Sequence, residues 1–284
     1  MNSLVIAVIA RYPQLREDRT TIFMFSLSVS DLAAGCTVMP ISAALCSGAT
    51  PEVADLDGLL PKVYVFMIWW FGFNSMHCLC WLTISKTIVI LNPFKVQQLL
   101  TRKCCYVIIG MNWIIGCVLA IVSFNVNVTW NTMTCAHRIP QDENLATFHV
   151  AHFVIAVVIP VLLILYGTAR IIIVVVRTHQ QICDLEHSIA VGSSSIGKTG
   201  FVTVQAIRSS RNVIIICVVS LVLNTPVFAF IVLRFLTAYH IPYVFRFVSM
   251  WLFESNTFVN SLLYLLLFKS VQRKVFHMFR TINT

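Results

Sequence analysis

Six long apolar runs dominate the sequence, and they constrain its fold more than any other feature. Each reaches the roughly 20 residues that a helix needs to cross a bilayer. They occupy residues 21–46, 63–92, 104–126, 146–176, 207–236 and 241–268. With 58% hydrophobic and only 11% charged residues, the composition excludes a disordered or ordinary soluble protein. Strands of a membrane barrel alternate in polarity over about 10 residues, whereas these runs are continuous, so we predict an all-α membrane protein.

Two shorter segments complete the predicted bundle. Residues 1–10 are apolar but reach only half the length needed to cross, so we expect a partial first helix whose remainder lies upstream. Counting it gives a seven-transmembrane helix bundle. Residues 269–281 combine apolar positions at helical spacing with Lys and Arg, which predicts a short amphipathic eighth helix in the membrane interface.

The distribution of Lys and Arg predicts the orientation. Most of the 20 basic residues fall in alternate loops, including the long loop at residues 177–211, and in the C-terminal segment. Because cytoplasmic loops are enriched in Lys and Arg, we expect a multi-pass plasma-membrane protein with the N-terminus outside and the C-terminus inside. The net charge of +9 therefore requires no nucleic-acid partner.

The predicted outer loop between residues 126 and 146 carries two candidates for modification. Asn127 begins an Asn-Val-Thr triplet, which is a glycosylation acceptor on a lumenal loop. Cys135 lies in the same loop, where an oxidising compartment permits a disulfide, and Cys46 at the outer end of its helix is the nearest candidate partner.

One nucleotide-binding pattern is rejected. Gly192–Thr199 fits the phosphate-loop pattern letter for letter. That loop needs a preceding buried strand and a following helix aimed at the phosphates, and neither is predicted here. We interpret the segment as a Gly/Ser-rich tether.

Two carboxylates interrupt the apolar runs. Asp31 and Glu254 lie inside predicted spans, where an ionisable residue is costly and suggests a function. The candidate partners of Asp31 are one or two polar groups on each of several helices: Asn2, Ser75, Asn224, Asn256 and Asn260. These groups either form a structural hydrogen-bond network or hold a sodium ion, for which we expect Asp31, Ser75, Asn256 and Asn260 as ligands.

A set of motifs in a fixed order resembles the rhodopsin-like (class A) G-protein-coupled receptors, over nearly the whole chain. The matching positions are Asn2 in the first helix, Asp31 in the second, Trp113 in the fourth, Pro160 in the fifth, Pro226 in the sixth, and Asn260 with Tyr264 in the seventh. The resemblance implies a receptor that transmits an extracellular ligand signal to a heterotrimeric G protein, with arrestin as a further partner.

Several positions depart from the family pattern. Ser85, Lys86 and Thr87 stand where the family has Asp-Arg-Tyr, so the local ion pair that restrains the inactive family members is lost. Asn224 replaces the sixth-helix tryptophan, and Ser261 replaces the seventh-helix proline. The resemblance implies that the conformational switch uses Asp31, Ser85, Lys86, Thr87, Asn224, Pro226, Asn260 and Tyr264.

The resemblance also predicts a ligand pocket. By alignment its lining would be Ile68, Trp69, Gly72, His152, Phe228, Trp251 and Glu254. Ile68 stands where amine receptors have an aspartate, which disfavours a biogenic-amine site, and Glu254 stands where opsins have the retinal lysine. A cation held by Glu254 is the sharper hypothesis, and a structural hydrogen bond is the plain alternative.

Three alternative functions were weighed. A receptor-like partner that binds or dimerises without signalling fits the altered motifs. A transporter would show inverted repeats, which the sequence lacks. We predict no enzyme, because no paired acid and base or nucleophile is present.

Overall fold

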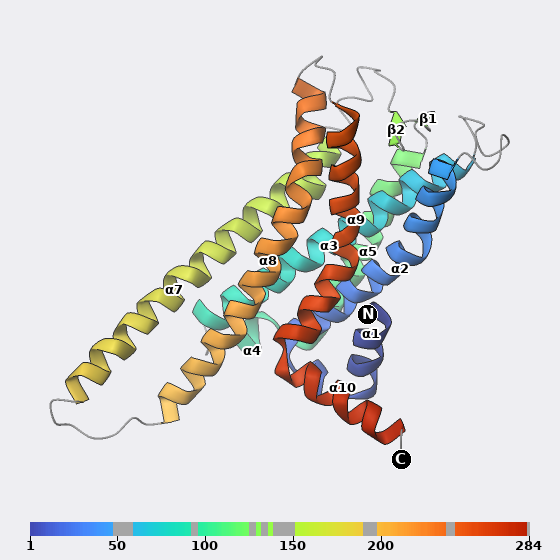
Figure 1. The fold of residues 1–284 in the computed structure, drawn as a ribbon. Helices are drawn as coiled ribbons and strands as arrows, with labels where there is room; N and C mark the ends of the chain where they lie inside the picture. The colour runs from blue at the N-terminus through green and yellow to red at the C-terminus, as the bar shows by residue number, and fades with distance from the viewer. Residues whose placement is uncertain are drawn as a thin grey trace.

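The computed structural model of the chain is an elongated helical bundle (Figure 1). It describes residues 1–47, 59–91, 96–124, 129–131, 136–138, 151–189, 198–236 and 242–282. The predicted candidates Asn127 and Cys135 lie outside these residues, and so does most of the phosphate-loop match.

Five helices in the described part of the chain are long and apolar enough to cross a membrane. They belong to α2 (Arg19–Ser47), α3 (Leu59–Leu91), α5 (Arg102–Phe124), α7 (Ile159–Ile189) and α8 (Lys198–Leu236). The helix α9 (Tyr243–Leu267) covers the sixth predicted run but is not among these five. It has the length, yet Glu254, Asn256 and Asn260 lower its hydropathy.

Shorter elements lie between and after the long helices. They are α1 (Asn2–Arg11), the 3-10 helix η1 (Pro13–Glu17), α4 (Val96–Leu99), the π-helical turn η2 (Val154–Val158) and α10 (Lys269–Ile282). The strands β1 (Thr129–Asn131) and β2 (Ala136–Arg138) pair antiparallel, with Trp130 opposite His137. A π-helical turn just before Pro160 fits the loss of one backbone donor at proline.

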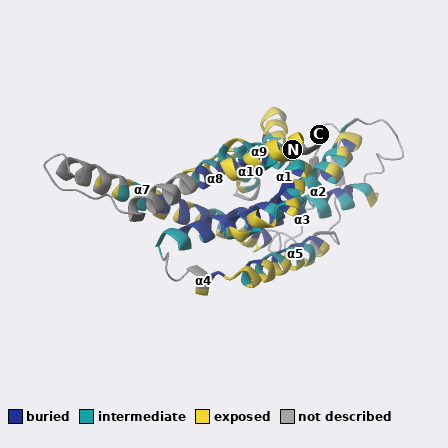
Figure 2. Cartoon of the chain, turned by 90° about the horizontal axis from the view of Figure 1, so that it is seen from below, coloured by how far each residue is buried: buried dark blue, intermediate teal, exposed yellow. Residues whose placement is uncertain are grey.

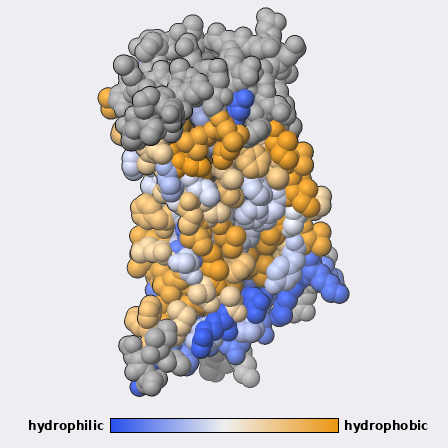
Figure 3. All heavy atoms as spheres, turned by 90° about the vertical axis from the view of Figure 1, so that its right-hand side faces the viewer, coloured by the Kyte–Doolittle hydropathy of each residue, from blue (hydrophilic) through white to orange (hydrophobic). Residues whose placement is uncertain are grey.

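The helix α3 forms the centre of the bundle. It packs against α2, α5 and α7, and also meets α8. Cys78, Leu82 and Thr83 on α3 are completely buried, and Figure 2 shows α3 dark along much of its length while α5 presents an exposed outer face. On the face shown in Figure 3 the middle of the bundle is largely hydrophobic, as expected for a lipid-facing surface.

The predicted loop at residues 177–211 is wrong for most of its length. The helix α7 continues to Ile189 and α8 begins at Lys198, so the two helices extend far beyond the apolar runs (Figure 1). Residues 177–189 are polar but contain neither proline nor glycine, and polarity alone does not end a helix.

The helix α10 lies across one end of the bundle, here called the α10 end (Figure 1). Tyr12 Oη and His277 Nδ1 are 3.1 Å apart, and Lys274 Nζ donates to Gln14 Oε1 at 3.1 Å. Val271 is buried against the bundle, whereas Phe276 is 75% exposed. The chain segment after α1 and the amphipathic helix therefore hold each other in place.

A close approach between α3 and α5 depends on Gly116. A Cβ atom added there would lie 2.8 Å from Phe73 Cδ1 and 3.0 Å from Asn74 Nδ2. By contrast, nothing lies within 4 Å of a Cβ added at Gly110 on the same helix. Gly110 can therefore serve as a control for a substitution at Gly116.

We predict that Gly116→Ala lowers the free energy of unfolding by about 1–3 kcal/mol, because the added methyl overpacks the interface. Gly110→Ala should be neutral or slightly stabilising. Thermal unfolding of both variants in detergent checks this. Equal melting temperatures for the two variants would contradict the close packing at Gly116.

Candidate functional site

A hydrogen-bond network at Asp31 joins three helices at the centre of the bundle. Asp31 on α2 is 2% exposed. Ser75 Oγ on α3 donates to Asp31 Oδ1 at 3.0 Å, and Asn260 Nδ2 on α9 donates to Asp31 Oδ2 at 3.0 Å. A buried carboxylate is thereby held by two neutral donors, each from a different helix.

The network continues from α9 into α8. Ser220 Oγ donates to Asn260 Oδ1 at 2.9 Å, and Asn224 Nδ2 donates to the Ser220 carbonyl at 2.6 Å. Both Ser220 and Asn224 are buried, one turn apart, and Pro226 lies inside the same helix. The position of α8 is thus linked through Asn260 to Asp31.

Asn2 does not join Asp31, contrary to one sequence prediction. Its Nδ2 atom donates to the Thr257 carbonyl at 2.9 Å, and Ser261 donates its hydroxyl to Asn2 Oδ1. Asn2 therefore ties α1 to α9. Of the other predicted partners, Ser75 and Asn260 bond Asp31, while Asn224 and Asn256 line the cavity beside it.

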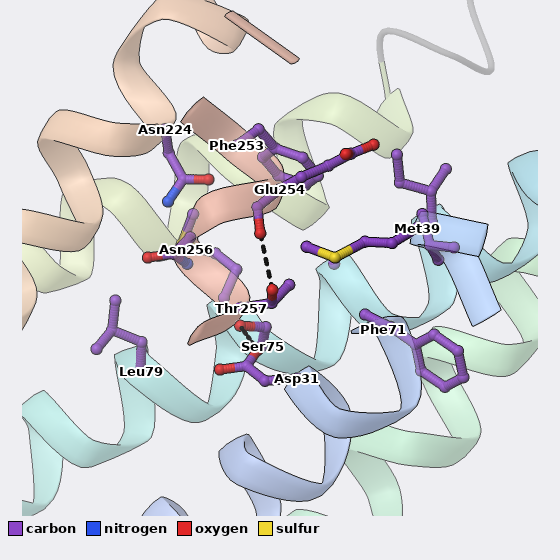
Figure 4. Close-up of a pocket in the computed structure, with 15 residues that line it drawn as sticks. Asp31, Met39, Phe71, Ser75, Leu79, Asn224, Phe253, Glu254, Asn256 and Thr257 are labelled. Carbon is purple, nitrogen blue, oxygen red and sulfur yellow. Dashed lines mark hydrogen bonds between the residues drawn. The ribbon is translucent and has the colours of Figure 1, made fainter. Parts of the chain in front are cut away.

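A cavity of about 610 Å³, its open mouth included, lies against this network (Figure 4). Its polar lining consists of Asp31, Ser75, Asn224, Glu254, Asn256 and Thr257. Its apolar lining consists of Ala34, Val38, Met39, Ile68, Phe71, Gly72, Met76, Leu79 and Phe253. The same cavity thus reaches both intramembrane carboxylates.

Three of the seven predicted pocket residues line this cavity: Ile68, Gly72 and Glu254. Trp69 instead contacts His152 in a tilted arrangement with ring centroids 4.4 Å apart, and the Phe228 and Phe153 ring centroids are 6.4 Å apart. These contacts pack α3 and α8 against the segment around η2.

Trp251 was predicted to line the pocket, and that prediction is wrong. The side chain is 61% exposed. At 100° per residue it falls on the same stripe of α9 as the exposed Val244, Phe247, Val248 and Phe258, opposite the face that carries Phe253 and Asn256.

At the α10 end, Lys86 has an acidic partner that the sequence did not indicate. Lys86 Nζ lies 3.5 Å from Asp18 Oδ2, and the Lys86 side chain is 7% exposed against 51% for Asp18. Asp18 Oδ1 also accepts from the Thr20 backbone N–H at 3.0 Å, at the start of α2. The expected loss of an ion pair at this position is therefore corrected: an acid distant in the sequence supplies one.

The neighbours of Lys86 bond within the bundle. Ser85 Oγ donates to the Leu82 carbonyl at 2.8 Å, and Thr87 Oγ1 donates to the Thr83 carbonyl at 2.9 Å. Thr87 also approaches the Gly167 carbonyl of α7 at 3.5 Å. The buried hydroxyl of Tyr264 has no hydrogen-bond partner among the described residues.

Comparison with known proteins decides the family. The model of the 7 transmembrane receptor (rhodopsin family) matches residues 1–264. The chain belongs to this receptor family. The predicted fold class, a seven-transmembrane bundle, is confirmed, and so is the prediction that the receptor is not an enzyme.

The receptor is similar to several curated dopamine receptors. It is 26% identical to the D(1A) dopamine receptor of Xenopus laevis over 207 residues, which is 66% of this chain and 43% of the relative. It is 28% identical to a D(1)-like dopamine receptor of Oreochromis mossambicus over 193 residues, 66% of this chain and 48% of the relative. The chain thus spans less than half the length of these relatives.

The sequence did not indicate a set of hydrogen bonds that joins α2, α3 and α5 at Ser26. Trp113 Nε1 on α5 donates to Ser26 Oγ on α2 at 3.2 Å, and Cys78 Sγ on α3 donates to the same oxygen at 3.3 Å. The motif identified Trp113 but not its acceptor. A lone serine in an apolar helix carries no signal that distinguishes it from Ser28, whose buried hydroxyl has no partner among the described residues.

We predict that Ser26→Ala destabilises the receptor by about 1–3 kcal/mol, because the partly buried Trp113 side chain loses the acceptor of its N–H group. Ser28→Ala, in the same helix, should be neutral or stabilising, since it removes an unpaired hydroxyl. Thermal unfolding of the two variants checks this, and an equal loss of stability would contradict the assigned bonds.

Proposed function

We propose that this receptor binds a small ligand from the extracellular side and transmits the signal to a heterotrimeric G protein at the α10 end. The observation that supports this most is the cavity, because it is lined by residues of α2, α3, α8 and α9 and includes Asp31 itself. A ligand there can favour one arrangement of the hydrogen bonds that tie these helices together. The similarity to receptors named for dopamine is consistent with a small-molecule ligand.

The signal depends on two arrangements of the bundle with different affinity for the ligand. A ligand shifts such an equilibrium only through contacts that differ between the two states. Asn224 and Asp31 line the cavity and also belong to the network through Ser220 and Asn260. Pro226 lies two residues after Asn224 and weakens α8 there, which allows that helix to bend locally.

The pair of Lys86 and Asp18 restrains the resting arrangement in this proposal. Lys86 is nearly enclosed, so losing its counter-charge leaves a poorly solvated ammonium. Moving the end of α3 away from the start of α2 must break the pair. In other family members, an acid next to the third-helix arginine forms the ion pair that restrains the resting state. In this receptor Asp18 would play that part.

We further propose that a sodium ion binds beside Asp31. Asn256 lines the cavity beside the network, and its buried Oδ1 atom has no hydrogen-bond partner among the described residues. Together with Ser75 and Asn260 it offers the oxygen ligands that a hard cation prefers. NaCl should raise the melting temperature more than choline chloride does, and Asp31→Asn should abolish the difference. A difference that persists in Asp31→Asn would contradict this site.

The proposal includes the predicted orientation, with arrestin as a second partner at the α10 end. Basic side chains gather there on η1, α5 and α10, including Arg16, Arg102, Arg273 and Arg280. This clustering supports a cytoplasmic position for that end.

We predict that Asp18→Asn raises basal G-protein activation about two- to ten-fold, which corresponds to roughly 0.4–1.4 kcal/mol against the resting state. Asparagine still caps α2, so only the charge is lost. Glu17→Gln removes an adjacent exposed acid that forms no ion pair with the described residues, and it should leave basal activity unchanged. Nucleotide exchange on a panel of G proteins, with the full-length receptor in membranes, measures both variants.

Equal basal activity in Asp18→Asn and Glu17→Gln would contradict the restraint. The altered positions Lys86, Asn224 and Ser261 also favour a second candidate, a receptor-like partner that does not signal. If neither the native receptor nor any variant activates any G protein in the panel, that second function replaces the first.

A further inference from the structure

Glu254 is an ionisable residue of α9 whose carboxyl group has no ion-pair partner in the described part of the chain. Its side chain is partly buried in α9 and lines the cavity. Its carboxylate forms no hydrogen bond or ion pair with the described part of the chain, whereas its backbone carbonyl accepts from Thr257 Oγ1 at 2.8 Å. Because a carboxylate in such surroundings is costly without a counter-charge, a partner from outside the chain is expected.

The described lining of the cavity contains no counter-charge. Among the described residues that line it, none is Lys, Arg or His. The other carboxylate, Asp31, already accepts from Ser75 and Asn260. Glu254 is six residues before Asn260, or about 9 Å along the helix, so its charge lies well away from the Asp31 network.

The surroundings of Glu254 favour a ligand with an apolar part next to its charged group. Ile68, Phe71, Met39 and Phe253 contribute aliphatic, aromatic and thioether surface to the same cavity (Figure 4). Gly72 keeps part of the α3 wall open, since a Cβ there would lie 3.4 Å from Phe253 Cζ, which is ordinary contact, and a longer side chain would fill the space.

We propose that the cavity binds an organic ammonium whose positive charge pairs with Glu254 on α9 and whose apolar body packs between α2 and α3. The counter-charge for the ligand's ammonium group thus comes from Glu254 on α9, whereas α3 contributes the uncharged Ile68 to the cavity. This inference names the ligand class of the proposed receptor function, and it concerns binding alone, so it can be tested without any signalling readout.

The test uses three primary amines of increasing size and their uncharged alcohol counterparts. The pairs are n-butylamine with n-butanol, 2-phenylethylamine with 2-phenylethanol, and tryptamine with indole-3-ethanol. Ligand-induced shifts in the melting temperature of the full-length receptor give the apparent affinities. At least one amine should bind about ten-fold or more tightly than its alcohol.

Four variants separate the contribution of the ligand's charge from that of its shape. Glu254→Gln should weaken the best amine by about 30-fold or more, as loss of a desolvated charge partner does, and leave the alcohol unchanged. Gly72→Leu should weaken amine and alcohol alike, whereas Gly72→Ala should affect neither strongly. Ile68→Asp combined with Glu254→Gln should restore amine binding, because both positions line one cavity.

The inference is overturned if no amine binds, if alcohols bind as tightly as amines, or if Glu254→Gln retains native amine affinity. A loss in Asp31→Asn that is larger than the loss in Glu254→Gln would place the charge at Asp31 and also overturn it. Amine binding that depends on Glu254 without G-protein activation would instead contradict the signalling function and leave the ammonium site intact.

Discussion

The structure depends on one constraint, that a polar group buried within a membrane bundle must be satisfied by other helices. Asp31 meets this constraint by accepting hydrogen bonds from Ser75 and Asn260. Asn260 in turn accepts a hydrogen bond from Ser220. Each bond fixes the rotation of a helix about its axis, because a helix turned by one residue would aim its donor elsewhere. The arrangement of α2, α3, α8 and α9 therefore follows from a few side chains, while apolar packing holds the helices together without specifying their rotation.

The same constraint explains how the receptor keeps the family fold with altered motifs. Ser261 stands in place of a proline and binds Asn2, so α1 remains attached to α9. Asn224 stands in place of a tryptophan and bonds within α8 beside the network. Lys86 stands in place of an arginine and finds Asp18 on a neighbouring segment. Ser261 and Lys86 thus still make contacts between elements, whereas Asn224 bonds only within its own helix.

Much of the helical framework could be predicted from the sequence, because length and hydrophobicity determine which segments cross a bilayer. The two donors to Asp31 were also among the predicted partners, since few polar groups occur within the spans. The side on which Trp251 lies was mispredicted, because an aromatic residue suits lipid and pocket equally. The ion pair of Lys86 with Asp18 joins residues far apart in the chain, and the extensions of α7 and α8 are polar, so neither left a local signal.

A double-mutant cycle between Asp31 and Asn260 tests the central claim most directly. The free energies of unfolding of Asp31→Ala, Asn260→Ala and the double variant give the coupling energy between the two side chains. A direct bond at the centre of the bundle predicts a coupling of about 1–3 kcal/mol, with the double variant less destabilised than the sum of the single ones. Additivity within about 0.5 kcal/mol would show that the two residues do not interact and would contradict the account.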